Sequence, residues 1–214
     1  MANVNVAFGL KPINTAGSTP ATSGTNAYFI DSGASAIFQG SIVKCDNGGE
    51  IVISSATADT EAPLGVFAGC EYVSSTTGKK VFSNTWPGSG ADTNFDIIGF
   101  VYDNPMQRYI IATDATFTNR ATAIAAIFEN TQLDSGASGN TTTGISSAKM
   151  DVATLDSSNA SLPLKIVGIQ DDVENEDFAA AGIPMIVMLN NHALLQADSE
   201  AVSYTHLTLP TIAI

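Results

Sequence analysis

The sequence predicts an all-β protein, and three observations lead to that prediction. Short runs of β-branched and aromatic residues recur along the chain, separated by Gly, Ser, Thr, Asn and Asp, as in strands joined by turns. Residues 63–87, PLGVFAGCEYVSSTTGKKVFSNTWP, form the clearest predicted hairpin, with two apolar runs around the polar turn Ser74–Lys80. A single segment has helical periodicity. Roughly nine strands and one short helix predict a β-barrel or a β-sandwich.

The predicted strands follow an N-terminal segment in which we expect no regular structure. Residues 1–26 place Gly and Pro among Ser, Thr and Asn, which predicts an extended arm whose Phe8 and Leu10 can insert into a neighbouring surface. Residues 27–200 then form the β-rich domain. Its strand candidates are Ala27–Ile30, Ile37–Cys45, Ile51–Ile53, Leu64–Val73, Val81–Ser83, Phe95–Tyr102, Arg108–Ala112, Leu162–Ile169 and Ile183–Leu189.

The helix candidate lies within a region, around 113–160, that has room for a small insertion. It spans Asn119–Glu129, with Thr118 or Asn119 able to accept hydrogen bonds from its first free N–H groups. Apolar residues at helical spacing predict one buried face. These residues are Ala121, Ile124, Ile127 and Phe128.

The last residues, 201–214, do not read as natural protein sequence. Residues 202–207, VSYTHL, are encoded by GTC TCT TAT ACA CAT CTN, a transposon end used as an adapter in DNA library preparation. We therefore interpret the chain from about residue 201 as translated adapter and leave it out of fold reasoning.

Composition and charge exclude several classes of partner. The chain has 214 residues, of which 44% are hydrophobic, and this is enough for one sizeable β domain or two small ones. Its net charge is −13, whereas nucleic-acid binding needs clustered Lys and Arg to displace counterions from phosphates. The N-terminus lacks the features of a signal peptide, and no apolar run approaches the ~20 residues of a membrane span. We expect no nucleic-acid or membrane partner, and synthesis in a cytoplasm.

The residue types that carry catalysis are sparse. Ser/His/Asp catalysis needs a His as base, and outside the adapter-derived tail His192 stands without a nucleophile motif. We expect His192 to be a hydrogen-bonded loop or interface residue, and we predict no enzymatic activity, no catalytic residue and no cofactor. Cys45 and Cys70 are predicted to be buried free thiols. Zinc needs about four ligands, usually Cys or His, which the chain does not supply.

Residues 171–177, DDVENED, form an acidic loop. Five acids in seven residues offer oxygen ligands for Ca²⁺, but their spacing does not fit an EF-hand loop. We expect this loop to be solvated or to face a basic partner, and we predict no metal site.

Several short motifs, in order along the chain, resemble a family of tailed-phage capsid decoration or cement proteins of marine and cyanobacterial podoviruses. The opening FGLKP of residues 8–12 resembles the FGLRP start of that family. Lys165, where relatives are expected to have Arg, and residues 106–109, where the usual pattern is more acidic, depart from it. The other matching segments are 37–43, 65–72, 80–83, 86–87, 101–105, 164–168, 175–176 and 190–192.

This resemblance implies a fold and a function. It implies an all-β, non-enzymatic protein with a tulip- or barrel-like domain, assembled in the host cytoplasm and bound to the major capsid protein on the exterior of the expanded phage capsid as a homotrimer. The family's own contact residues are not carried over; our candidate capsid-contact residues, from the predicted arm and its FGLKP motif, are Phe8, Leu10, Lys11 and Pro12. Two alternatives stay open: a tail- or fibre-associated β-protein, and a bacterial carbohydrate-binding β-sandwich, which should present exposed aromatic residues.

Overall fold

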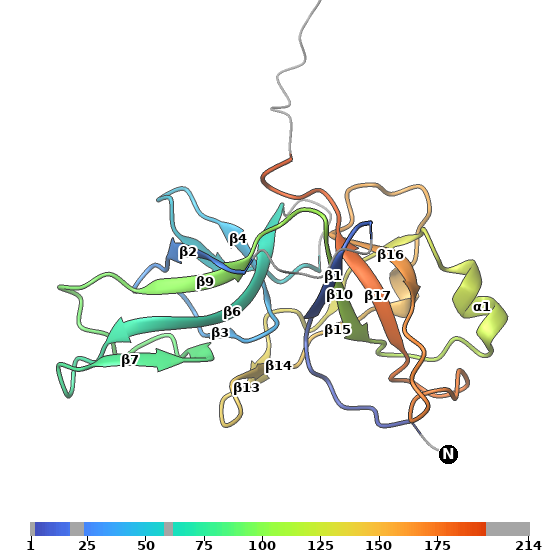
Figure 1. Cartoon of the computed structure of the whole chain (residues 1–214), viewed down its shortest axis with the longest axis horizontal. Coiled ribbons are helices and arrows are strands. Elements are labelled where there is room, and N and C mark those ends of the chain that lie inside the picture. Colours follow the sequence, from blue (N-terminus) through green and yellow to red (C-terminus); the bar gives the residue numbers. More distant parts are fainter. Residues whose placement is uncertain (1–2, 18–23, 58–61, 196–214) are drawn as a thin grey trace, which may run out of the picture.

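A computed structural model of the chain describes residues 3–17, 24–57 and 62–195 (Figure 1). The adapter-like tail, 201–214, lies outside the described residues. Within them, strands dominate, with one α-helix, α1 (Arg120–Ala125), and one 3-10 turn, η1 (Val152–Thr154). The predicted all-β class is confirmed. The strands build two lobes that lie side by side in Figure 1, each around its own apolar core.

The first lobe is built on an antiparallel sheet, which we call sheet I. Its strand order is β2-β9-β6-β4-β5, and β7 pairs with the far half of β6. Its inner face packs on a core that includes Phe67, Val101 and Trp86. The strands are β2 (Asn26–Phe29), β4 (Ile42–Cys45), β5 (Ile51–Ile53), β6 (Pro63–Val73), β7 (Lys80–Ser83) and β9 (Ile98–Tyr102), and a separate pair joins β3 (Ile37–Phe38) to β8 (Thr85–Trp86).

The hairpin predicted within residues 63–87 is present. Strands β6 and β7 pair from Cys70 opposite Ser83 to Val73 opposite Lys80, and a polar turn joins them. Trp86 follows, fully buried, and its Nε1 donates a 3.2 Å hydrogen bond to the carbonyl of Ala34. The two apolar runs around a polar turn therefore predicted this segment correctly.

The second lobe is built on sheet II, with strand order β1-β10-β17-β16-β11. One face of this sheet packs on a core that includes Tyr109, Ile166 and Val187. Among the described residues, the order in both sheets runs from one edge strand to another. The strands of sheet II are β1 (Lys11–Thr15), β10 (Gln107–Ala112), β11 (Asn130–Thr131), β16 (Leu164–Ile169) and β17 (Pro184–Leu189).

The expectation that residues 1–26 lack regular structure is wrong for β1 and for the start of β2. Lys11 pairs with Ile110 and Pro12 with Tyr109, so the segment supplies an edge strand to sheet II. Leu10, just before β1, is only 2% exposed and belongs to the core of the second lobe. The sequence did not predict this strand for two reasons. The segment is rich in Gly and Pro, and its partner strand, β10, lies far along the chain.

The predicted helix is present but shorter, and of its predicted apolar face only Ile127, just after the helix, packs against the core. Asn119 caps α1 through a capping box with Thr122, and the helix ends at Ala125. Ala123 and Ala126 are the buried residues, whereas Ile124 and Phe128 are 51% and 70% exposed. The chain leaves the helix before the helical spacing reaches Phe128, whose positive φ of 77° marks the bend.

The rest of the 113–160 region includes two short strand pairs, one in contact with the second lobe and one in contact with β3 of the first lobe. Ala148 and Met150 from this region contribute to the sheet II core, so the region is packed rather than extended. The pairs are β12 (Leu133–Asp134) with β15 (Lys149–Met150) and β13 (Gly139–Asn140) with β14 (Ile145–Ser146).

Sheet I connects the two lobes, because its two faces contact different cores at one end. Val66 on β6 and Ile42 on β4 pack into the core of sheet II, while Phe67 and Val43, the next residues along each strand, pack into the core of sheet I. Successive side chains of a strand point to opposite faces, so this end of sheet I lies between both cores.

No helix in the described part of the chain has the length and apolar character of a membrane span.

Candidate functional site

The four predicted contact residues come together in one small cleft. Phe8, Leu10, Lys11 and Pro12 line a hollow of about 150 Å³ where the N-terminal segment crosses between the lobes. The opposite wall includes Tyr102 of β9. The remaining lining residues are Gln39, Gly40, Phe67 and Ile145.

The structure divides these four residues into a core residue and three surface residues. Leu10 is buried, and its N–H donates a 2.9 Å hydrogen bond to the Gly40 carbonyl, so its side chain is not free to contact a partner. Lys11 is exposed, and its Nζ lies 4.5 Å from the centroid of the Phe8 ring, within cation–π range. Of the four predicted contact residues, Phe8, Lys11 and Pro12 are therefore the ones that a partner can reach.

A second feature, which sequence reasoning missed, is an open apolar face on the outer side of sheet I. Opposed residues of paired strands share a face. Phe82 pairs with Glu71, Glu71 with Ile98, and Ile98 with Phe29, so the three apolar side chains share the outer face. Phe100, two residues after Ile98 on β9, lies on the same side. We call Phe29, Phe82, Ile98 and Phe100 the aromatic face.

The aromatic face is open because the second lobe covers only one end of sheet I. Val66 and Tyr102 of the outer face pack into the sheet II core. Beyond them, Phe82 is 70% and Phe29 is 51% exposed. A hollow of about 480 Å³, lined by Phe82, Phe100 and Tyr102, runs from the covered end to the open end. Contiguous exposed apolar surface on a folded protein is typical of an interaction site.

One ion pair lies within the aromatic face, because Glu71 stands between Phe82 and Ile98 in the row of paired residues. Lys80 Nζ lies 2.7 Å from a carboxylate oxygen of Glu71 and 5.8 Å from the Phe82 ring centroid. Both charged side chains are solvent-accessible, so the pair contributes little to stability. A partner that covers the aromatic face therefore meets one ion pair among the apolar side chains.

His192 is buried, as its predicted role as a hydrogen-bonded loop residue allows. Its Nδ1 accepts a 3.2 Å hydrogen bond from the Leu194 N–H, and its side chain is 3% exposed. Its Nε2 has no hydrogen-bond partner within the described residues. Burial lowers the pKa of His192, partly opposed by the charge of Asp103. The ring lines a cleft of about 360 Å³ with Lys165 and Met188.

The two cysteines differ, which corrects the prediction that both are buried. Both thiols are free, but Cys45 is exposed at the end of β4, beside the turn 46–49. Cys70 is buried in the sheet I core, and burial raises its pKa to about 12. Cys70 is accordingly unreactive as a nucleophile, because the thiolate is the reactive form.

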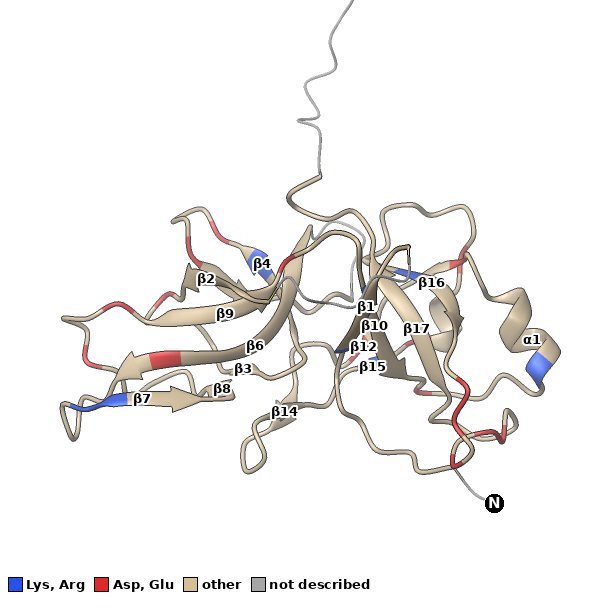
Figure 2. Cartoon of the chain, viewed as in Figure 1, with Lys and Arg blue, Asp and Glu red and all other residues tan. Residues whose placement is uncertain are grey.

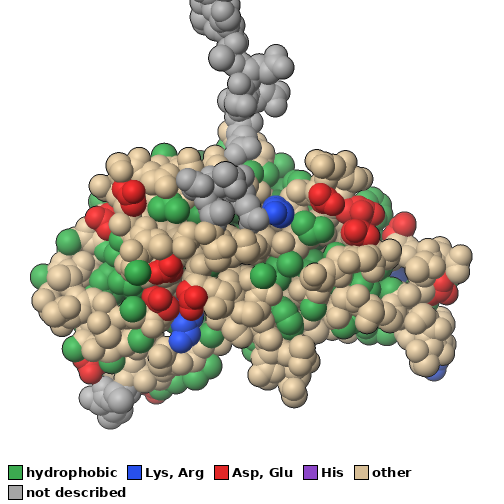
Figure 3. Space-filling view, turned by 180° about the vertical axis from the view of Figure 1, so that it is seen from behind, with side chains coloured by type: hydrophobic (Ala, Val, Ile, Leu, Met, Phe, Trp, Pro, Cys, Tyr) green, Lys and Arg blue, Asp and Glu red, His purple; other side chains and the backbone are tan. Residues whose placement is uncertain are grey.

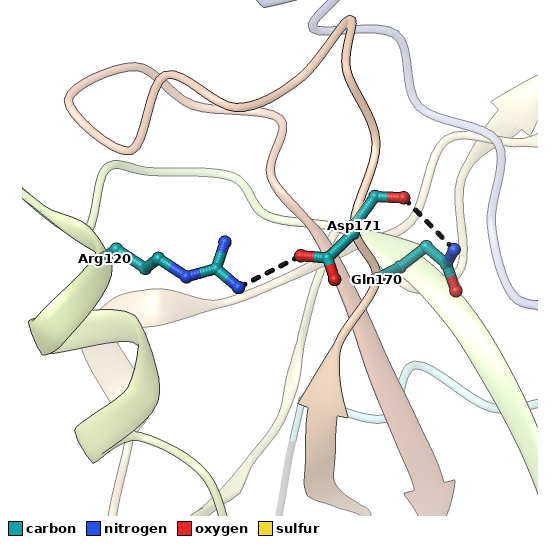
Figure 4. Close-up of polar contacts among 3 residues, drawn as sticks. All are labelled: Arg120, Gln170 and Asp171. Carbon is teal, nitrogen blue, oxygen red and sulfur yellow. Dashed lines mark hydrogen bonds and ion pairs between the residues drawn. The ribbon is translucent and has the colours of Figure 1, made fainter.

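The acidic loop is partly bound by its own chain. Arg120 of α1 forms an ion pair with Asp171 at 3.0 Å, and Gln170 donates to the Asp171 carbonyl (Figure 4). Asn3 donates to the carbonyls of Asp177 and Ala181 and accepts from the Asp177 N–H. Within the described residues, no group of three or more His, Cys, Asp or Glu side chains is arranged to hold a metal ion.

Acidic residues occur in the loops of both lobes, whereas basic residues are few (Figure 2). The rear view shows small acidic groups set among hydrophobic and neutral polar side chains (Figure 3). Within the described residues, acidic side chains are therefore present on both lobes and are most concentrated in the acidic loop, residues 171–177.

Comparison with known proteins gives no family or fold assignment. No family model matches the chain, and no curated protein or solved structure is significantly similar to it.

Proposed function

We propose that the chain is a virion structural protein that binds the exterior of the expanded phage capsid and stabilises it. In this proposal the partner is the major capsid protein and the protein acts as a homotrimer, as the resemblance of the ordered motifs implies. A protein that binds the expanded lattice and not its precursor stabilises the expanded state by mass action.

The observation that carries the proposal is the aromatic face. Phe29 and Phe82 expose large aromatic surface on an otherwise well-packed sheet, at the end that the second lobe leaves open. Burying such side chains against a partner contributes roughly 1.5–3 kcal/mol for each fully buried residue. The face is continuous, through Tyr102, with the cleft that holds Phe8 and Lys11.

The position of β1 changes the proposed role of the N-terminal segment. Leu10 and strand β1 belong to the fold of their own chain, so they do not extend across neighbouring capsid subunits. We propose instead that Phe8 and Lys11 form the near end of one contact surface with the aromatic face. Several such surfaces in one oligomer multiply weak contacts through effective concentration.

Co-sedimentation with expanded capsid shells tests the proposal. Phe82→Ser is expected to weaken shell binding by at least about tenfold, given the loss of one buried aromatic contact. Phe128→Ser is the matched control, because Phe128 is also 70% exposed but lies beside α1 on the other lobe. If the unmodified protein remains in the supernatant with expanded shells, the capsid proposal is wrong, and sedimentation with purified tails supports the tail-associated alternative.

The aromatic face also favours a second candidate, a carbohydrate-binding module. Aromatic rings stack on sugar faces, and the hollow beside Phe82 and Phe100 offers Thr25, Ser83 and Asn84 as hydrogen-bonding neighbours. The two candidates are separated by titrating soluble polysaccharide into the protein. Displacement of the protein from shells by polysaccharide would show that one face serves both ligands, whereas binding to polysaccharide without binding to shells supports the second candidate alone.

A further inference from the structure

The outer face of sheet II carries three cations in one small area. Arg108 pairs with Met188, and Met188 pairs with Lys165, which places the three side chains in one row across β10, β17 and β16. In the next row, Lys11 pairs with Ile110, and Ile110 pairs with Ile186. Opposed residues share a face, and this face is the one opposite the buried Tyr109 and Val187. We call Lys11, Arg108, Ile110, Lys165, Ile186 and Met188 the basic face.

The basic face stands out against the charge of the chain. The whole sequence has 8 Lys and Arg against 21 Asp and Glu, and three of these cations lie on this face. None of the three forms an ion pair within the described residues, and the apolar residues between them are half-buried. Unpaired cations around a partly exposed apolar strip complement a partner that presents carboxylates beside an apolar side chain.

His192 adds a separate indication that an acceptor belongs beside this face. Its Nδ1 accepts from the Leu194 N–H, so the neutral ring carries its proton on Nε2. That donor is buried and has no partner within the described residues, and the ring lines the same cleft as Lys165 and Met188. A carboxylate oxygen in this cleft would accept from Nε2 and pair with the Lys165 ammonium.

The acidic loop, residues 171–177, has the complementary surface. Val173 is 86% exposed, the highest value among the large hydrophobic residues described, and acids flank it on both sides. Arg120 fixes one end of the loop through its ion pair with Asp171, as Figure 4 shows, and Asn3 fixes the other end through its hydrogen bond to Asp177. A loop that is fixed at both ends loses little conformational freedom on docking.

We propose that the acidic loop of one copy of this chain docks on the basic face of a second copy. Val173 then covers the apolar strip at Ile110 and Met188, the loop carboxylates pair with the cations, and one carboxylate enters the His192 cleft. Loop and face are different surfaces of one chain, so the contact is head-to-tail and generates a ring or a filament. The contact supplies an interface for the oligomer of the proposed function and otherwise does not depend on that function.

Sedimentation velocity of the purified chain over a range of concentrations tests this contact. Association is expected at about 50 mM salt and is expected to weaken at about 500 mM, where screening is stronger. The double variant Arg108→Glu with Lys165→Glu is expected to weaken association at least about tenfold. The double variant Glu174→Lys with Glu176→Lys is expected to do the same, and an equimolar mixture of the two double variants is expected to recover association, because opposite charges then face each other again.

The matched control reverses two cations elsewhere. Lys79→Glu with Lys80→Glu changes the tip of the β6–β7 hairpin on the other lobe and is expected to leave association unchanged. The proposal is wrong if the unmodified chain stays monomeric at low salt, if the control weakens association as much as the basic-face variant, or if the mixture fails to recover it. Capsid binding is measured separately, so an unmodified chain that stays monomeric but still binds shells overturns this interface alone.

Discussion

The hydroxyl of Tyr28 donates a 2.5 Å hydrogen bond to the carboxylate of Asp103, a buried acid on the segment between β9 and β10. The amide of Asn26 donates to both oxygens of the same carboxylate, at 2.8 and 3.0 Å. Three donor contacts replace the water that Asp103 loses on burial. Burial, and then the hydrogen bond and charge of Asp103, raise the pKa of Tyr28 to about 12.

Removing the Tyr28 hydroxyl is therefore expected to destabilise the first lobe. Tyr28→Phe leaves a buried carboxylate short of one donor, which costs about 1–3 kcal/mol of unfolding free energy. Urea denaturation measures this change. Tyr72→Phe is the control, because the Tyr72 ring packs edge-on against Trp86 while its hydroxyl makes no hydrogen bond within the described residues. Equal losses in both variants would contradict the role of Asp103.

The same pair predicts a pH dependence. The pKa of Tyr28 is raised above its unfolded value of 10.0, so the folded state keeps a proton that the unfolded state releases. The stabilisation is complete below about pH 10 and is lost as pH rises toward about 12. Thermal melts between these pH values are expected to show a steeper decline for the unmodified chain than for Tyr28→Phe. Parallel pH profiles would argue against the coupling.

His192 predicts the opposite dependence, at acid pH. Burial holds its pKa below 6.5, so the unfolded state binds a proton that the folded state resists. The stability contribution is complete above about pH 6.5 and is lost as pH falls below it. His192→Gln keeps a side-chain donor without titrating and is expected to reduce the slope between pH 6.5 and 5, as read from urea midpoints at each pH. An unchanged slope would exclude His192 as its source.

The two cysteines are expected to differ in reactivity. Cys45 is exposed, whereas Cys70 is buried with its pKa raised to about 12 and its thiol 3.4 Å from the Thr85 carbonyl. A chromogenic disulfide reagent should therefore titrate one thiol in the native protein and two after denaturation. Cys45→Ser should abolish the native reaction, and Cys70→Ser should leave it unchanged. Rapid reaction of Cys70 in the native state would show that β6 and β7 open readily.

Substitutions at two aromatic residues near the end of the hairpin are expected to differ strongly in their effect on the unfolding free energy. Trp86 is fully buried, and Trp86→Ala should cost about 3–5 kcal/mol through lost burial and a remaining cavity. Phe82→Ser, at a 70% exposed position, should change the unfolding free energy by less than about 0.5 kcal/mol. Guanidinium denaturation of both variants measures the contrast. A large loss for Phe82→Ser would show that the aromatic face stabilises the fold rather than awaiting a partner.

The sequence predicted where strands lie better than it predicted which strands pair and which side chains are exposed. The hairpin could be predicted because its apolar runs and polar turn are local features. Strand β1 could not, because its pairing with β10 joins segments far apart in the chain, and tertiary context decides such pairing. Cys45 was expected to be buried from its place in a strand, but it lies at the strand end beside a solvated turn.

The residues of the candidate site were also only partly predictable, because their exposure depends on tertiary structure. Phe8, Leu10, Lys11 and Pro12 were chosen by resemblance, and the structure brings them together, with Leu10 in the core. Phe82 and Phe100, by contrast, each resemble core residues within their own strands. Their exposure depends on how much of sheet I the second lobe covers, and the local sequence does not predict this.

Close packing between β6 and β9 supplies the last prediction. A Cβ on Gly65 would lie 2.3 Å from the Tyr102 carbonyl oxygen and 2.6 Å from a methyl of Val101, and a carbonyl in a sheet cannot move aside cheaply. Gly65→Ala is therefore expected to cost at least about 2 kcal/mol, because overpacking here separates two central strands of sheet I. Gly168, in β16, is the matched control, since its nearest neighbour would be the end of the Ile186 side chain at 3.8 Å.

Gly168→Ala is expected to change stability by less than about 1 kcal/mol, since the added methyl finds ordinary contact distance and strands disfavour Gly. Urea denaturation of the two variants compares them directly, and amide exchange of β9 shows whether the damage lies at the β6–β9 pairing. Equal stability of both variants would mean that β6 and β9 can separate without cost. That outcome would also weaken the proposed function, because the aromatic face depends on this pairing to hold Phe82 and Phe100 on one surface.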